Sequence, residues 1–184
     1  MMTRKEKEKL WVLAFAAIFV VGFSLGQVSS VFELGVADGT EPGGIFTVEV
    51  WHDGELLLQE THNLVVDIGK TKARDYFSAG STDITKYLSL SNDETPLASW
   101  TKLPNEVTDS GLARAAGVVS NVNSTAYKTE YTWTATATVT VQCTGVHWIV
   151  TSGSDNNLYA AGTFTQVTLN DQDTIKITYT LNFG

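Results

Sequence analysis

The run YTWTATATVTV, Tyr131–Val141, decides the fold class, because large or apolar side chains alternate there with threonine at every second position. A period of two is the period of a β-strand. One face of such a strand packs against a core, while the threonines on the other face contact water. This alternation is typical of antiparallel sheets with one solvated face. We therefore expect one long strand over residues 127–141.

Runs of similar character lie on both sides of it. The segment Ile45–Thr61 alternates around Asp53-Gly54, a strong signal for a tight hairpin turn, and predicts a β-hairpin. Further strands are expected at Lys86–Ser91, Leu112–Ser120, Gly145–Thr151, Leu158–Leu169 and Asp173–Phe183, with a tight turn at Asn170-Asp171. About eight short strands around one core predict an all-β fold, an antiparallel β-sandwich of jelly-roll type, over residues 45–184.

One segment of this domain has helical spacing instead. Within Asp67–Ser78, the residues Gly69, Ala73, Tyr76 and Phe77 recur at helical intervals. Asp67 is suited to cap the first turn and Gly80 to end the last. We therefore expect a single helix within the β-domain.

The N-terminus has the pattern of a membrane-targeting segment. Met1–Lys9 carries a net charge of +2, and Leu10–Val28 (LWVLAFAAIFVVGFSLGQV) contains no charged residue. Residues 1–28 therefore predict one hydrophobic helix that is an export signal or a membrane anchor, with Ser29 onward outside the membrane. Its length suits a span of roughly 17–25 residues, whereas the small residues at Ser29-Ser30 suit cleavage, so both outcomes stay open. We expect an exported protein, extracellular or on a cell or virion surface.

Residues 29–44 are rich in glycine and acidic residues and predict a linker ahead of the domain. Its first segment, Val31–Val36, alternates like a short strand. Two interpretations follow: a linker that contacts the domain surface, or a donor strand that completes the sheet of a neighbouring copy. The donor-strand residues would be Val31, Phe32, Leu34 and Val36.

Charge and cysteine content exclude some functions. The formal net charge of the 184 residues is −8, and the basic start leaves about −10 on the remainder. Nucleic-acid binding needs clustered Lys and Arg, so we expect no nucleic-acid partner. The single cysteine, Cys143, allows no intrachain disulfide. It is expected to be a buried small side chain near a strand end, the alternatives being an intermolecular disulfide or a reactive thiol.

No motif carries catalytic chemistry. The three histidines, His52, His62 and His147, have no zinc-site spacing, and no nucleophile or phosphate-binding motif is present. We expect no enzyme, no catalytic residue and no cofactor. Calcium binding by the oxygen-rich runs Ser152–Asn157 and Asn92–Glu94 competes with a simple interpretation as polar turns.

Two surface features have functional alternatives. Trp51 and Trp100 would stack on sugars if they were exposed, although tryptophan in a sandwich more often belongs to the core. Asn123-Ser124-Thr125 is a glycosylation sequon in an expected turn, so Asn123 is a candidate attachment site.

An ordered set of short pieces resembles a β-sandwich domain of tailed-phage and archaeal-virus structural proteins and of related archaeal surface proteins. The set covers residues 45–184 and reads THNLV (61–65), YLSLSN (87–92), PNEV (104–107), GLARA (111–115), YTWTAT (131–136), LYAAGTF (158–164) and DTIKITY (173–179). The resemblance implies a structural subunit that polymerises or decorates a surface. The chain departs from the virion domains in its export segment, which points to a surface-displayed or extracellular relative.

Three hypotheses follow for the function. The first is a structural subunit of an extracellular filament, virion or cell surface that assembles with copies of itself through β-strand contacts. The alternative is a membrane-anchored adhesin or carbohydrate-binding module, held by residues 10–28 if these are not cleaved. A secreted hydrolase would need two carboxylates facing each other across a cleft, and the acidic residues here lie mostly at expected turns.

Overall fold

The computed structural model describes residues 43–62, 64–79, 85–93 and 95–182. The expected N-terminal helix and the arm Val31–Val36 lie outside these ranges. The described residues belong to one compact unit, Asp38–Gly184. Within them, no helix has both the length and the apolar character needed to cross a membrane.

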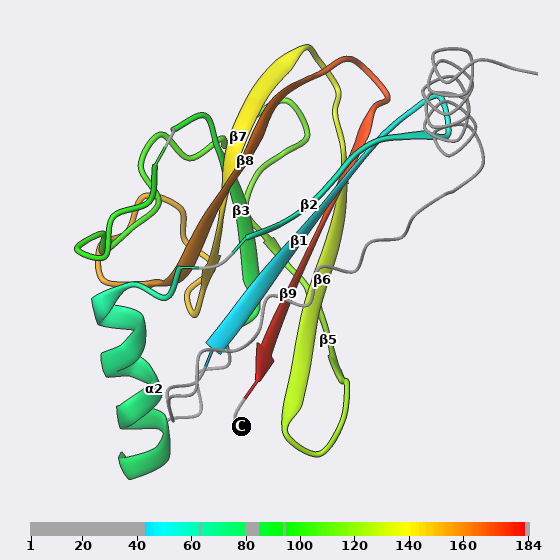
Figure 1. Cartoon of the computed structure of the whole chain (residues 1–184). Coiled ribbons are helices and arrows are strands. Elements are labelled where there is room, and N and C mark those ends of the chain that lie inside the picture. Colours follow the sequence, from blue (N-terminus) through cyan, green and yellow to red (C-terminus); the bar gives the residue numbers. More distant parts are fainter. Residues whose placement is uncertain (1–42, 63, 80–84, 94, 183–184) are drawn as a thin grey trace, which may run out of the picture. The chain divides into compact units, whose positions relative to one another are not determined.

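The described residues contain one helix and nine strands, and the strands form two antiparallel sheets (Figure 1). Sheet A has the strand order β2-β1-β9-β6-β5, and sheet B has the order β4-β3-β7-β8. The elements are β1 (Gly43–His52), β2 (Glu55–His62), α2 (Asp67–Ala79), β3 (Tyr87–Ser91), β4 (Ala115–Ala116), β5 (Val118–Asn121), β6 (Ala126–Thr134), β7 (Val139–His147), β8 (Leu158–Leu169) and β9 (Thr174–Asn182). The expected antiparallel β-fold, the first hairpin and the helix are confirmed.

The expected single strand over residues 127–141 is wrong. The chain ends β6 at Thr134 and resumes as β7 at Val139, and these two strands belong to different sheets. Hydrogen bonds join the Ala135 N–H to the Asp173 carbonyl (2.8 Å) and the Gln172 N–H to the Ala135 carbonyl (2.9 Å). They fix the place where the chain leaves sheet A. Odd-numbered residues face the core in β6 and again at the start of β7, so the alternation continues without a break. The alternation alone therefore could not reveal that the chain passes from one sheet to the other.

The expected strand Leu112–Ser120 is also divided. It contains β4 of sheet B and β5 of sheet A, with Gly117 between them. A Cβ at Gly117 would lie 2.3 Å from the Thr129 hydroxyl, so only glycine fits where the chain crosses the edge of the sandwich. The expected strand at Gly145–Thr151 is the end of β7, which stops at His147.

The main core lies between the inner faces of the two sheets. Sheet A contributes Phe46, Val48, Val50, Ile175, Ile177 and Tyr179, and sheet B contributes Leu88, Leu90, Val141, Val146, Tyr159 and Phe164. Two sheets that bury a shared apolar face form a β-sandwich.

A second, smaller cluster of buried residues consists of Val66, Leu103, Cys143, Leu158 and Ala161, with Trp100 packed against it. Cys143 is buried as expected, but it lies in the middle of β7, not near its end. Burial raises the pKa of its thiol to about 12. Helix α2 lies so close to β8 that a Cβ at Gly69 would be 2.0 Å from the Tyr159 carbonyl oxygen.

Candidate functional site

The four edge strands of the sandwich differ in how well they are protected. Unpaired backbone groups at a sheet edge are a template for another strand, and proteins usually cover, shorten or charge such edges. The β8 edge is covered, because Val65 bridges Ala160 and the Ala161 N–H donates to the Leu64 carbonyl at 2.9 Å. The β4 edge is only two residues long.

The β2 edge is charged and linked to the opposite sheet. The Glu60 carboxylate on β2 accepts a hydrogen bond from the Thr165 N–H on β8 at 2.8 Å. Glu49 and Gln59 form a further side-chain hydrogen bond between β1 and β2. Leu56 and Leu57 are exposed beside the hairpin turn, at one end of the strand.

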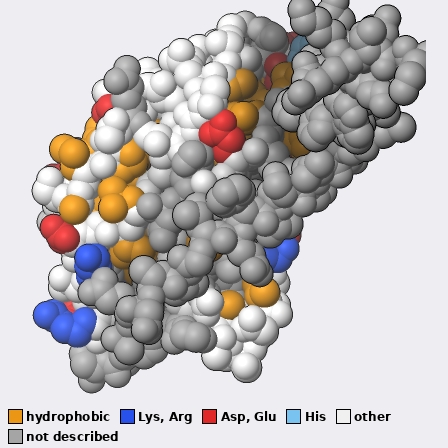
Figure 2. Space-filling view, viewed as in Figure 1, with side chains coloured by type: hydrophobic (Ala, Val, Ile, Leu, Met, Phe, Trp, Pro, Cys, Tyr) orange, Lys and Arg blue, Asp and Glu red, His pale blue; other side chains and the backbone are white. Residues whose placement is uncertain are grey.

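Within the described part of the chain, the β5 edge is neither covered nor charged, and its four residues make it longer than β4. Val118–Asn121 (VVSN) carries no charge and no proline, and among the residues that the structure describes no strand pairs with its outer side. Val118 is 68% exposed, Val119 is 41% exposed and Val122, just after the strand, is 52% exposed. Figure 2 shows a small group of hydrophobic side chains at the lower right, over this side of sheet A. We call Val118–Val122 the open edge.

A row of ion pairs lies on the outer face of sheet A next to the open edge. Lys128 Nζ is 2.8 Å from Glu130 Oε2, and Lys176 Nζ is 3.6 Å from both Glu130 and Glu49. The hydrogen bond from Lys128 lowers the pKa of Glu130. The outer face of the sheet is therefore charged up to β6, whereas β5 beyond it is uncharged.

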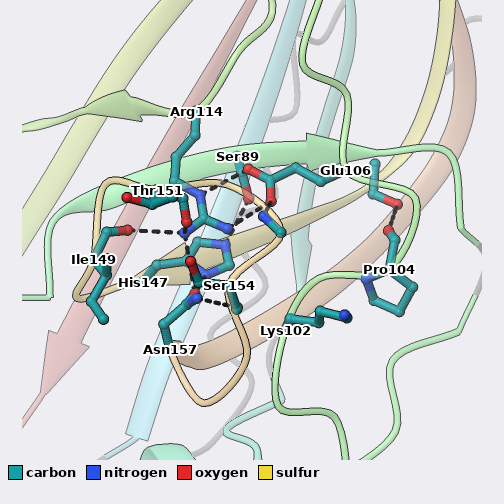
Figure 3. A network of polar contacts seen from close by, with 12 residues as sticks. Ser89, Lys102, Pro104, Glu106, Arg114, His147, Ile149, Thr151, Ser154 and Asn157 are labelled. Atoms are coloured by element: carbon teal, nitrogen blue, oxygen red, sulfur yellow. Dashed lines mark hydrogen bonds and ion pairs between the residues drawn. The ribbon is translucent and has the colours of Figure 1, made fainter.

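At the loop end of the sandwich, a buried ion pair joins two long loops (Figure 3). The Arg114 guanidinium donates to both carboxylate oxygens of Glu106 at 2.6 and 2.8 Å, and the two side chains are only 1% and 4% exposed. The same guanidinium donates to the carbonyls of Ile149 (2.9 Å) and Thr151 (3.0 Å) and to Asn157 Oδ1 (3.1 Å). This bidentate geometry fixes the 148–157 loop against the 103–114 loop.

His147 extends this network into the core. Its Nδ1 lies 2.6 Å from Asn157 Oδ1 and its Nε2 lies 2.7 Å from the Ser89 hydroxyl. Asn157 Oδ1 already accepts from Arg114, so the imidazole must carry its proton on Nδ1 and accept from Ser89 at Nε2. Burial, followed by the nearby Arg114, lowers the pKa of His147 to about 3. The histidine is therefore neutral at physiological pH.

The chain of hydrogen bonds from Ser89 through His147 to Asn157 has the same order as a nucleophile, a base and an orienting group in a catalytic triad. Its setting opposes that chemistry. Ser89, His147 and Asn157 are all fully buried, which leaves a substrate no access to the hydroxyl. A catalytic base must also become an imidazolium, and Arg114 destabilises that cation where a triad supplies a negative charge. The geometry favours a structural role for these residues.

A second histidine joins the turns at the opposite end of the strands. His52, at the end of β1, hydrogen-bonds through Nδ1 to the Asp173 carboxylate, and Asp173 also accepts from the Asn170 N–H at 2.8 Å. The hydrogen bond with Asp173 raises the pKa of His52. The hydrogen bond from the Asn170 N–H, together with the weaker effect of the one from His52, lowers the pKa of Asp173, although desolvation acts in the opposite direction. The β1–β2 and β8–β9 turns are therefore connected by a pair that depends on pH.

The other residues that the sequence singled out lie apart from each other. Asn123 is exposed in the turn between β5 and β6, and its Oδ1 accepts from the Thr125 N–H at 2.8 Å. Trp51 and Trp100 are half-buried. The expected donor strand, Val31, Phe32, Leu34 and Val36, lies outside the described residues.

The two runs considered for calcium have other partners. Asn157 turns inward to Arg114 and His147, and its amide donates to the Ser154 carbonyl. Asp93 accepts from the Asn105 side chain. Among the described residues, no group of three or more His, Cys, Asp or Glu side chains is placed to hold a metal ion.

Comparisons with known proteins name no family for the chain. No protein-family model matches it, and no curated protein matches it.

Proposed function

We propose that this chain is an exported structural subunit of an extracellular filament, virion or cell surface, and that it assembles with copies of itself by strand addition at the open edge. The observation that carries the proposal is the contrast between the described edges: β8 is covered, β4 has two residues, and β2 is charged and linked to β8. Among the described residues, β5 alone is neither covered nor charged, is longer than β4 and carries exposed valines. Main-chain hydrogen bonds along an added strand supply strength without a catalytic site.

The remaining features of the proposal come from the sequence. The hydrophobic segment at residues 10–28 would export the chain or anchor it, and the acidic charge would keep subunits soluble before assembly. The resemblance to virion and archaeal surface domains points to the same class of function. We propose no enzymatic activity, cofactor or nucleic-acid partner.

We further propose that the sandwich is of jelly-roll type. Its C-terminal strands form a nested pair of antiparallel ladders: β7 pairs with β8 in sheet B, and β6 pairs with β9 in sheet A. A two-stranded ribbon folded over two sheets in this way is the unit of a Greek key, from which jelly rolls are built.

Charge substitutions on the two edges of sheet A test the assembly proposal. Val119→Lys places a charge on the open edge, and Leu57→Lys, on the exposed end of β2, is the matched control. We expect Val119→Lys to shift the full-length protein from assemblies to monomers in sedimentation velocity and electron microscopy. Because Val119 is 41% exposed and otherwise packs at the rim of the core, its loss should cost about 1 kcal/mol of stability. Leu57→Lys should assemble normally. Normal assembly of Val119→Lys would contradict the proposal.

The adhesin alternative is favoured by one observation. Figure 2 shows hydrophobic side chains gathered at the left, over the loops after β3 and after β7, where Leu97, Ile149 and Val150 are exposed. Arg114 donates to the Ile149 and Thr151 carbonyls and so fixes the backbone that carries Ile149 and Val150. Thermal melts of the protein across a panel of glycans would test a carbohydrate ligand, and a concentration-dependent rise in the melting temperature would favour this alternative.

A further inference from the structure

The two faces of the open edge continue two different surfaces of sheet A. Val119 pairs with Thr129, which pairs with Tyr179, and both of these partners are fully buried. Val119 therefore extends the core-facing row to the rim of the sheet. Val118 pairs with Glu130 and so extends the outer row that carries the ion pairs. A strand added here would need one apolar face and one face that tolerates charge.

The segment Val31–Val36 has these two faces in its sequence. Alternate residues of an extended chain share a face. Phe32, Leu34 and Val36 therefore form one wholly apolar set. The other set is Val31, Glu33 and Gly35, with a single carboxylate.

We propose that the strand added to the open edge is Val31–Val36 of a second copy, with Phe32, Leu34 and Val36 on the core side and Glu33 on the outer side. The inward set covers Val119 at the rim of the core. The outward carboxylate joins the row that contains Lys128, which pairs with Ser120 of β5 on the outer face. This inference rests on the proposed function, and it adds the donor segment, its source and its phase.

Chain geometry favours a second copy over the same copy as the donor. Strand β1 begins at Gly43, and the position beyond β5 is four strand spacings from β1, about 19 Å. The seven Cα steps from Val36 to Gly43 extend over at most about 23 Å. Donation within one copy would therefore need a nearly taut linker across the end of sheet A. Donation between copies imposes no such constraint and leaves each subunit with one free donor and one free edge, which is the condition for a filament.

Cysteine cross-linking in the full-length protein tests the donor, its source and its phase. The native Cys143 is buried and its thiol pKa is raised to about 12, so it stays unreactive at neutral pH. One copy carries Val119→Cys, and a second, differently tagged copy carries Phe32→Cys, Leu34→Cys or Val36→Cys. Neighbouring residues of paired strands have Cβ atoms about 4.5–5.5 Å apart, near enough for a disulfide after small shifts.

We expect at least one of these three mixtures to give a heterodimer that carries both tags on a non-reducing gel. Glu33→Cys and Gly35→Cys are the phase controls. They should give several-fold less product with Val119→Cys, whereas Glu33→Cys should link to Val118→Cys on the outer face.

Three results would overturn the inference. If the protein assembles but no inward position links to Val119→Cys, or if Glu33→Cys links to it equally well, the proposed function survives and the donor is wrong. If the double variant Leu34→Cys/Val119→Cys forms its disulfide only within one monomer, the source is wrong. If the full-length protein forms no assemblies, the proposed function fails together with the inference.

Discussion

Removing the Arg114 guanidinium should destabilise the fold more than any surface substitution. The Glu106 side chain is only 4% exposed, and Arg114→Met leaves its buried carboxylate without the bidentate partner. The carbonyls of Ile149 and Thr151 lose a hydrogen-bond donor as well. Breaking a buried pair in this way costs about 3–5 kcal/mol. For a domain of this size, such a loss lowers the melting temperature by about 10 °C.

Urea unfolding of Arg114→Met, Glu106→Gln and the double variant, followed by tryptophan fluorescence, measures this cost and the coupling between the two residues. The double variant should be less destabilised than the two single losses added together, because it leaves no uncompensated buried charge. Lys102→Ala is the control. Its pair with Asp155 spans 3.1 Å but is exposed, and losing it should cost about 0–1 kcal/mol. A loss below about 1 kcal/mol for Arg114→Met would refute the assignment of the network as the anchor of both loops.

Further predictions concern pH and packing. The raised pKa of His52 means that its pair with Asp173 stabilises the fold below pH 6.5 and that this contribution is lost as the pH rises through the raised pKa. Urea midpoints measured from pH 5 to 9 should therefore fall on the alkaline side, and His52→Gln should flatten that fall; an unchanged slope would contradict the pairing. The contribution of His147 to stability changes with pH in the opposite direction. Because its pKa is lowered to about 3, this contribution is complete above pH 6.5 and is lost as the pH falls towards 3. Gly69→Ala should cost about 1–3 kcal/mol, because its Cβ would meet the Tyr159 carbonyl at 2.0 Å, whereas Gly43→Ala, with nothing within 4 Å, should be nearly neutral in the same urea assay.

Local patterns in the sequence were enough to predict the antiparallel class, the first hairpin and α2. Asp53-Gly54 fixes its turn through backbone conformation alone, and both residues do have positive φ. The switch between sheets at 135–138 could not be predicted, because β6 and β7 keep the same alternation on both sides of it. Gly117 was the one local signal for the division between β4 and β5, since an isolated glycine in a strand often marks a close backbone approach.

The polar network could not be predicted from sequence spacing. Arg114 lies 8 residues from Glu106 and 43 from Asn157, and Ser89 lies 58 residues from His147, so no motif joins them. The only signal was one arginine within an otherwise weakly charged segment. The open edge needed the structure as well, because its lack of protection appears only when β5 is known to end a sheet.

The two kinds of feature make sense together in a subunit that assembles. An uncharged edge strand with exposed valines is a liability for a protein that works alone, because it invites aggregation. Among the described strands the fold limits that liability to the four residues of β5, and the ion pairs of Lys128, Glu130 and Lys176 lie directly beside it. The buried Arg114–Glu106 pair contributes specificity of a different kind, since it fixes the loops rather than the sheet. A monomeric function gives no reason to leave β5 open while the other described edges are protected, whereas strand addition requires one open edge for each subunit.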